Sequence, residues 1–298
     1  MNFLHFLEET KSSIEDRMEE GTQVSITSIQ KNNGIKKDGI CILESGHNIS
    51  PTIYLNDYYE KYLDGMEIED VVREVLEVYK RSKVESGVDL DFFLDYEKAK
   101  KKLVYKLVNY EKNSNWLAGV PHLEYLDLAI TFYCIVNNER FGSAVIQISN
   151  AHLNMWDVTL DNIYEAARQN TPLLLPYELL SMEQVLGSML GEGCEEMPDL
   201  SEQEVSMYVL SNTSRVNGAA TILYPDILKD FAKACGRDLY ILPSSVHEVI
   251  LVPDTGIGNP ETFQEMIQDV NATQLSPEEV LSDHVYIFKR KKNEIISG

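Results

Sequence analysis

Small polar side chains gather between apolar runs in one stretch of the chain, residues 206–254. They are Asn212, Asn217, Ser244, Ser245, His247 and Glu248. A serine beside a histidine suggests nucleophilic catalysis, in which the imidazole takes the hydroxyl proton and a carboxylate, here Asp254, orients the imidazole. That chemistry also needs oxyanion donors, and the G-x-S-x-G turn of many hydrolases is absent. We therefore predict no catalytic residue in this stretch.

Residues 243–248 have two further interpretations. Pro-Ser-Ser is typical of a tight turn, and it stands between the apolar runs DLYIL and EVILVP. One interpretation is a purely structural turn. The other is a binding surface on that turn, formed by Ser244, Ser245, His247, Glu248 and Asn212.

The histidines do not predict a metal site. A zinc protease needs two histidines one helical turn apart, with a glutamate between them. His247-Glu248 is followed by VILVP, which lacks the second histidine and is strand-like, so the two side chains would point to opposite faces. The six histidines, at positions 5, 47, 122, 152, 247 and 284, show no ligand spacing.

Nucleotide and carboxylate-pair motifs are also missing. Asp254-Thr255-Gly256 resembles the triplet of aspartic proteases, but that chemistry needs two carboxylates and the triplet occurs once. The pair Gly256 and Gly258 lacks the third glycine of a dinucleotide loop, and no GxxxxGK[ST] occurs. We expect no cofactor.

Composition indicates an acidic globular protein. The 298 residues are 44% hydrophobic and 25% charged, with a net charge of −22. Such a charge repels phosphate backbones, so we expect no direct nucleic-acid binding and instead a basic protein partner.

Cysteine usage and hydropathy predict a cytoplasmic location. The cysteines at 41, 134, 194 and 235 form no CxxC pair. The longest apolar run, LAITFYCIV at 128–136, is about half the length of a membrane helix. We interpret it as a strand buried on both faces, and Glu8 and Glu9 interrupt any signal-peptide core.

Apolar spacing predicts the helices that flank these strands. Helices are expected at 3–18, 54–63, 68–79, 159–169 and 181–190, and strands at 121–137 and 143–149. Residues 90–110 begin as a helix and either continue as one or become a strand.

Tyrosines 54, 58, 59 and 62 form a stripe that has two interpretations. It could stack on bases or sugars, or it could be a half-buried helix face, which is the interpretation that we favour.

An acidic Gly- and Pro-containing segment, residues 191–204, suggests a linker. We accordingly predict two subdomains, 1–198 and 199–298, the second with the order strand-strand-helix-strand-strand-helix-strand. Asn217-Gly218 predicts a type I′ hairpin between the first two strands of the second subdomain.

Two further local patterns lie near the end of the chain. Ser276 and Glu279 match a capping box. A last strand at 285–288 ends in the basic run KRKK, and we expect these basic residues to guard a sheet edge.

Four segments resemble one bacterial family of unknown function, which recurs in Clostridia and other gut Firmicutes, often on mobile elements. They are TIYLNDYYEKYLDGMEIEDVV, MYVLSNTSRVNGAATILYPDILKDFA, DLYILPSSVHEVILVPD and LSPEEVLSDHVYIFKR. The resemblance covers roughly residues 20–292. It implies a cytosolic bacterial protein and carries over no functional residue.

These observations together predict an α+β fold, with antiparallel sheets built from hairpins and helices packed on them. For function, we favour a noncatalytic protein-interaction or accessory protein over an enzyme. The alternative is a small-molecule-binding protein or enzyme whose site is dispersed in the sequence. A weaker alternative is an acidic mimic of nucleic acid. The sequence leaves the oligomeric state open.

Overall fold

A computed structural model provides the structure of the chain, and it describes residues 1–45, 47, 50–82, 91–138, 142–190 and 206–298. The chain groups into two compact units. Unit 1 contains residues 1–92 and 136–144, and unit 2 contains residues 93–135 and 145–298. The expected boundary at 198/199 and the expected linker at 191–204 fall on residues 191–205, outside the described part. That division therefore stays a prediction.

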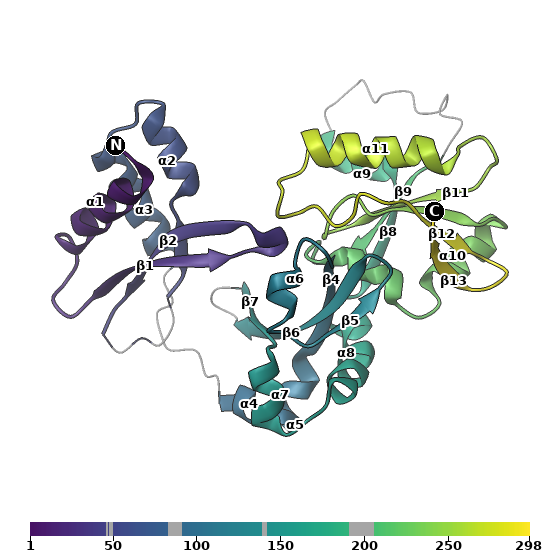
Figure 1. The fold of residues 1–298 in the computed structure, drawn as a ribbon, viewed down its shortest axis with the longest axis horizontal. Coiled ribbons are helices and arrows are strands. Elements are labelled where there is room, and N and C mark those ends of the chain that lie inside the picture. The colour runs from purple at the N-terminus through teal and green to yellow at the C-terminus, as the bar shows by residue number, and fades with distance from the viewer. Residues whose placement is uncertain (46, 48–49, 83–90, 139–141, 191–205) are drawn as a thin grey trace. The chain divides into compact units, whose positions relative to one another are not determined.

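Unit 1 is a three-stranded antiparallel sheet with three helices (Figure 1). Its elements are α1 (Phe3–Glu15), β1 (Gln23–Gln30), the 3-10 turn η1 (Asn32–Gly34), β2 (Lys36–Leu43), β3 (Thr52–Tyr54), α2 (Asn56–Leu63) and α3 (Ile68–Ser82). The order in the sheet is β1-β2-β3. The core joins Phe6 of α1, Ile40 of β2 and Val75 of α3, all fully buried, so burial of one face of each element holds the unit together.

The tyrosine stripe lies against this core. Tyr58, Tyr59 and Tyr62 are partly buried beside the core residues, and the Tyr59 and Phe6 rings lie 5.2 Å apart. The Tyr59 hydroxyl donates a hydrogen bond to the Met1 carbonyl at 2.9 Å. The half-buried helix face is confirmed for these three tyrosines of α2, whereas Tyr54 lies outside the helix, at the end of β3.

The first part of unit 2 is built on a buried central strand. Its elements are α4 (Asp91–Leu94), α5 (Tyr96–Ala99), η2 (Lys100–Lys102), β4 (Leu103–Asn109), α6 (Ser114–Leu117), β5 (His122–Tyr125), β6 (Leu128–Asn138), β7 (Gly142–Gln147), α7 (Asn150–Trp156) and α8 (Leu160–Leu174), of which α4, β6 and β7 each have a few residues grouped with unit 1. β6 pairs with β4 on one side and with β5 and β7 along the other, and residues 128–136 are all buried. The buried strand predicted from LAITFYCIV is confirmed, but the single strand expected at 121–137 is divided into β5 and β6 by a turn at 126–127. Residues 90–110 turn from helix to strand at Leu103.

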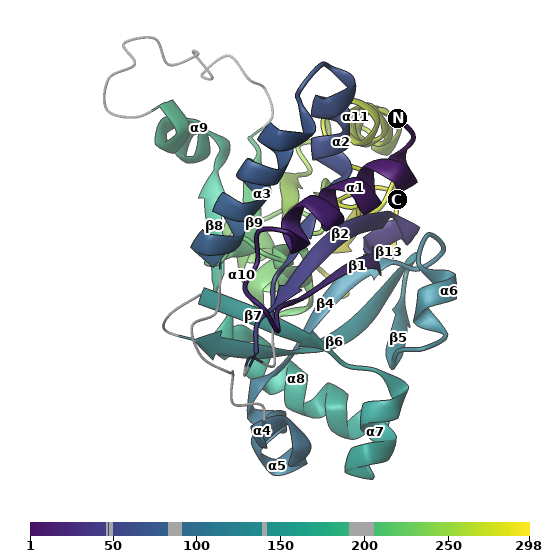
Figure 2. The same ribbon diagram turned by 90° about the vertical axis from the view of Figure 1, so that its left-hand side faces the viewer.

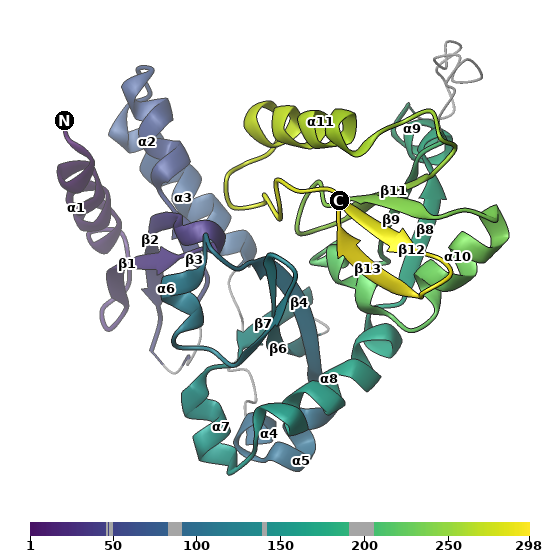
Figure 3. The same ribbon diagram turned by 45° about the vertical axis from the view of Figure 1, so that its right-hand side comes forward.

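The second part of unit 2 is a six-stranded antiparallel sheet, in the order β13-β12-β10-β11-β9-β8. Its elements are β8 (Tyr177–Ser181), α9 (Met182–Leu190), β9 (Tyr208–Asn212), η4 (Gly218–Leu223), α10 (Ile227–Cys235), β10 (Leu239–Leu242), β11 (Val249–Pro253), α11 (Pro260–Thr273), β12 (Tyr286–Lys289) and β13 (Glu294–Ser297). α11 covers one face, where Phe263 packs on Tyr240, and α10 lies on the other face, where Phe231 meets Tyr208 (Figures 1 and 3). The α+β fold with antiparallel sheets is thereby confirmed.

Three local predictions are wrong. Asn217-Gly218 begins the 3-10 helix η4 rather than a hairpin, so the second strand expected after it does not form. Residues 277–279 form a single turn that does not continue as a helix, and Val280 and Leu281, which follow it, are buried. The KRKK run forms the turn between β12 and β13, so β12 lies inside the sheet and β13 forms the edge.

A carboxylate joins the two sheets of unit 2. Asp127, in the β5–β6 turn, accepts hydrogen bonds from the hydroxyls of Tyr286, at 2.6 Å, and Ser282, at 2.7 Å. Both donors are fully buried. The segment that leads into β12 is therefore held against the β5–β6 hairpin by charge-assisted hydrogen bonds.

Candidate functional site

Residues 243–248 form the turn between β10 and β11, as the sequence predicts. Neighbouring segments hold this turn by its backbone. The Val246 carbonyl accepts from the Ala219 N–H at 3.2 Å, and the Val246 N–H donates to the Glu279 carbonyl at 2.8 Å. The Ser211 hydroxyl donates to the His247 carbonyl at 2.7 Å. The turn is thus fixed by η4, β9 and the 276–279 segment together.

Gly218 allows the close approach of η4 to this turn. A Cβ atom there would lie 2.8 Å from the Asn212 nitrogen and would also overlap the Ser211 hydroxyl and the His247 carbonyl. Any larger residue would separate η4 from β9 and the turn. This packing requirement explains why the Asn-Gly pair stands here without forming a hairpin.

Both ring nitrogens of His247 face a polar group, and these two contacts set the orientation of the ring. Nδ1 accepts a hydrogen bond from the Asn217 N–H at 3.3 Å, so the proton of the neutral ring is on Nε2. Nε2 faces the Glu279 carboxylate, with 3.8 Å between Nε2 and Oε1. Sequence reasoning missed Glu279 as a neighbour of His247, because the two residues are far apart in the chain.

The remaining predicted site residues separate into distinct roles. The Ser245 hydroxyl accepts the His247 N–H at 3.0 Å, which folds the turn. The Asn212 side chain bonds the Ser214 N–H and the Val216 carbonyl, which shapes the loop before η4. Ser244 and Glu248 are half-buried, and within the described residues neither side chain bonds to His247. The structure thus brings Ser245 and His247 together but shows no serine hydroxyl donating to the imidazole among the described residues.

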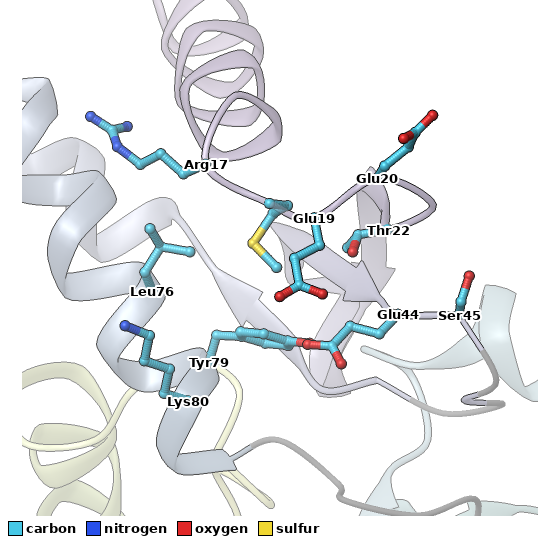
Figure 4. Close-up of a pocket in the computed structure, with 10 residues that line it drawn as sticks. Arg17, Glu19, Glu20, Thr22, Glu44, Ser45, Leu76, Tyr79 and Lys80 are labelled. Carbon is cyan, nitrogen blue, oxygen red and sulfur yellow. The ribbon is translucent and has the colours of Figure 1, made fainter.

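A pocket of about 540 Å³ lies within unit 1, where the end of α1, the end of β2 and α3 meet (Figure 4). Its lining combines carboxylates, cations and apolar groups: Arg17, Met18, Glu19, Glu20, Thr22, Glu44, Ser45, Leu76, Tyr79 and Lys80. Ligand pockets are typically about 300–1,000 Å³. The cavity is therefore large enough for a side chain or a small molecule.

Glu44 and Tyr79 form the fixed part of this pocket. The Tyr79 hydroxyl donates to Glu44 Oε1 at 2.9 Å, and Tyr79 is 5% exposed. Burial, reinforced by the hydrogen bond to Glu44, raises the pKa of Tyr79, so its hydroxyl remains a donor at neutral pH. Figure 4 shows the carboxylates of Glu19 and Glu44 directed toward Tyr79, whereas that of Glu20 points away.

The charge of the pocket is negative. Glu19 and Glu20 are exposed, and no described residue forms an ion pair with either of them. Arg17 is already bound to the Glu69 carboxylate and to the Ser13 carbonyl. Lys80 also lines the pocket, and it forms no ion pair with any residue that the structure describes.

The sequence contains one signal that could have pointed to this pocket, namely acidic residues at a helix end where negative charge is unfavourable. Glu15, Asp16, Glu19 and Glu20 lie at and just beyond the C-terminus of α1, and its last turn has no basic residue. The helix dipole disfavours negative charge at that end. Such exceptions tend to occur at functional sites.

Neither a metal site nor a membrane span is found in the described part of the chain. Its histidine, cysteine and acidic side chains include no group of three placed to hold a metal ion. None of its helices is both long enough and apolar enough to cross a membrane.

Comparison with known proteins identifies a family without a known activity. Neither the curated proteins nor the solved structures compared include a match. The family described as "Family of unknown function (DUF5688)" matches residues 3–290, which is nearly the whole chain. The chain therefore belongs to the DUF5688 family.

Proposed function

We propose that this protein is a noncatalytic interaction protein of the bacterial cytoplasm that binds a basic protein partner through the unit 1 pocket. The observation that carries the proposal is the arrangement of Glu19 and Glu44 around an apolar lining. An arginine or lysine side chain has matching parts, because its methylenes pack on apolar surface while its charged head seeks carboxylates.

The lining provides both kinds of contact. Met18, Leu76 and the Tyr79 ring offer apolar surface for the methylenes. Glu44 is held in place by the Tyr79 hydroxyl, so little side-chain entropy is lost when it binds a cation. The exposed Glu19 completes a two-carboxylate site for a guanidinium group.

The overall charge favours the same partner. A net charge of −22 raises the local concentration of basic molecules and speeds their association. Those long-range forces act on any basic protein. The pocket would supply the specificity for a particular side chain.

The test uses the full chain and a fluorescein-labelled peptide in which arginine alternates with glycine. Fluorescence anisotropy at an ionic strength of about 0.15 M measures its affinity, because salt screens nonspecific attraction there. We expect the double variant Glu19→Gln/Glu44→Gln to bind about tenfold more weakly, since two partly exposed ion pairs contribute up to about 1 kcal/mol each.

A matched control separates the pocket from net charge. Glu8 and Glu9 are exposed on α1 and do not line the pocket, so Glu8→Gln/Glu9→Gln removes the same charge elsewhere in unit 1. We expect its affinity to stay within about twofold of the parent, because distant exposed charges are screened. Equal losses in the two double variants, or no binding to the parent chain, would refute the pocket as the binding site.

A second candidate function is small-molecule binding at the turn of residues 243–248. The contact between His247 and the sequence-distant Glu279 supports it. The test is NMR of the His247 ring during addition of amino acids, organic acids and nucleotides at millimolar concentration. A chemical-shift change that disappears in Glu279→Gln would support this candidate, and no change with any compound would contradict it.

A further inference from the structure

Strand β8 forms one edge of the six-stranded sheet, and part of its backbone has no hydrogen-bond partner among the residues that the structure describes. β8 pairs with β9 through its even-numbered residues, because the Pro176 carbonyl accepts from Thr213 and the Met182 N–H donates to Met207. Backbone groups alternate in direction along a strand. The N–H and C=O groups of Tyr177 and Leu179 therefore point away from β9, and β8 is the last strand of the sheet among the described residues.

The run of outward-facing backbone groups on β8 is limited at both of its ends. Pro176 precedes it and has no N–H to donate. After it, the Ser181 N–H is bound by the Gln184 side chain at 2.9 Å, which starts helix α9. The edge that remains is one short stretch centred on Leu179.

The segment around β8 is apolar and almost uncharged. Residues 172–190 include two charged residues, Glu178 and Glu183, whereas charged residues make up 25% of the chain. Glu178 is paired with Arg215 at 3.0 Å. Leu173 and Tyr177 are 77% and 48% exposed, which is unusual for apolar side chains beside a sheet edge.

Helix α9 adds to this apolar surface. Five of its nine residues are Met, Val or Leu, and none of its described side chains is fully buried. Figures 2 and 3 show α9 at the β8 end of the sheet. An apolar helix beside an open sheet edge is an incomplete layer that another chain can complete.

We propose that β8 pairs with β8 of a second copy of this chain, antiparallel and about a twofold axis at Leu179, so that two six-stranded sheets become one. In this register Leu179 of each copy donates to and accepts from Leu179 of the other. Each Tyr177 N–H donates to the Ser181 carbonyl of the other copy. The existing Ser181–Gln184 hydrogen bond is retained.

The register is complementary with itself, as an isologous interface requires. Leu179 lies opposite Leu179, and Glu178 lies opposite Leu180, so no like charges face each other. The twofold axis also places the two α9 helices on the same face of the joined sheet. Each could then bury apolar side chains that one copy alone leaves partly exposed.

Charge favours a second copy at this surface over other contacts between copies. Two chains of net charge −22 repel each other over most of their surface. Segment 172–190 has two charged residues, one of which, Glu178, is paired with Arg215, so the repulsion there is smaller than the charge of the whole chain suggests.

The test is the mass of the full chain by light scattering after gel filtration, over a range of concentrations. We expect twice the chain mass of 33.9 kDa. Leu179→Pro removes the outward N–H and leaves the β9 ladder intact, and proline is tolerated at such edge positions. Leu179→Lys keeps the backbone but places two ammonium groups opposite each other at the axis. Both variants should have the mass of one chain.

Ile296→Lys on the β13 edge is the matched control, and it should keep the mass of the parent. Circular dichroism establishes that each variant is folded, and Leu179→Lys alone suffices if Leu179→Pro unfolds. A parent chain that stays monomeric at every concentration would overturn the proposal. A dimer that persists in Leu179→Lys would do the same.

Discussion

The contact between Asp127 and Tyr286 should be a major contribution to the stability of unit 2. The two donors to Asp127, Tyr286 and Ser282, are fully buried. Burial, and then the negative charge of Asp127, raise the pKa of Tyr286 well above its usual value, so its hydroxyl stays a donor. A hydrogen bond to a charged group contributes about 1.5–3 kcal/mol net.

Asp127→Ala should therefore lower the free energy of unfolding by about 3–5 kcal/mol, because it leaves two buried hydroxyls without their acceptor. Tyr286→Phe removes one donor and should cost about 1.5–3 kcal/mol. The two changes remove the same hydrogen bond. The double variant should consequently be more stable than the sum of the single effects predicts, by about 1.5–3 kcal/mol.

The measurement is denaturant unfolding followed by tryptophan fluorescence, since both tryptophans, Trp116 and Trp156, belong to unit 2. Tyr240→Phe is the control, because Tyr240 is buried in the same sheet and makes no contact with Asp127 in the structure. Its effect should add to that of Asp127→Ala. A coupling below about 0.5 kcal/mol between Asp127 and Tyr286 lies within ordinary additivity, and it would refute the reasoning.

Three other substitutions test separate features of unit 2. Gly218→Ala should destabilise by about 1–3 kcal/mol, since the new Cβ would overlap the Ser211 hydroxyl and crowd the Asn212 nitrogen; an unchanged melting temperature would contradict this packing. Leu126→Gly should stabilise by about 0.5–1 kcal/mol, because Leu126 is 40% exposed and has a left-handed φ of 56°; a lower melting temperature would show that its side chain matters more than its backbone. Burial lowers the pKa of His152, so its stabilising effect is complete above pH of about 6.5 and is lost as the pH falls through the folded pKa. His152→Gln should flatten the pH dependence of unfolding below that pH, and an unaltered profile would argue against it.

The sequence predicts the elements of this fold best where burial dominates. The apolar run at 128–136 becomes the buried strand β6, and Tyr58, Tyr59 and Tyr62 become a half-buried helix face. In both cases one property, the spacing of apolar side chains, decides the outcome. The helices at 159–169 and 181–190 follow the same principle.

Where tertiary contacts decide, the local pattern is misleading. Asn217-Gly218 has the composition of a hairpin turn, yet its glycine is needed because η4, β9 and the 243–248 turn meet there. Glu279 completes a capping motif in the sequence, but in the structure it faces His247. The partner of each residue is distant in the chain, and no local rule contains that information.

The two proposals lie in different units, so each experiment also checks the other. Glu19 and Glu44 belong to unit 1, and Leu179 belongs to unit 2. Sites with no shared contacts act additively. Leu179→Lys should therefore leave the affinity for the arginine peptide unchanged, and Glu19→Gln/Glu44→Gln should leave the mass unchanged. If loss of the dimer instead abolished peptide binding, the binding site would have to include both copies, and the pocket within unit 1 would not be sufficient to explain it.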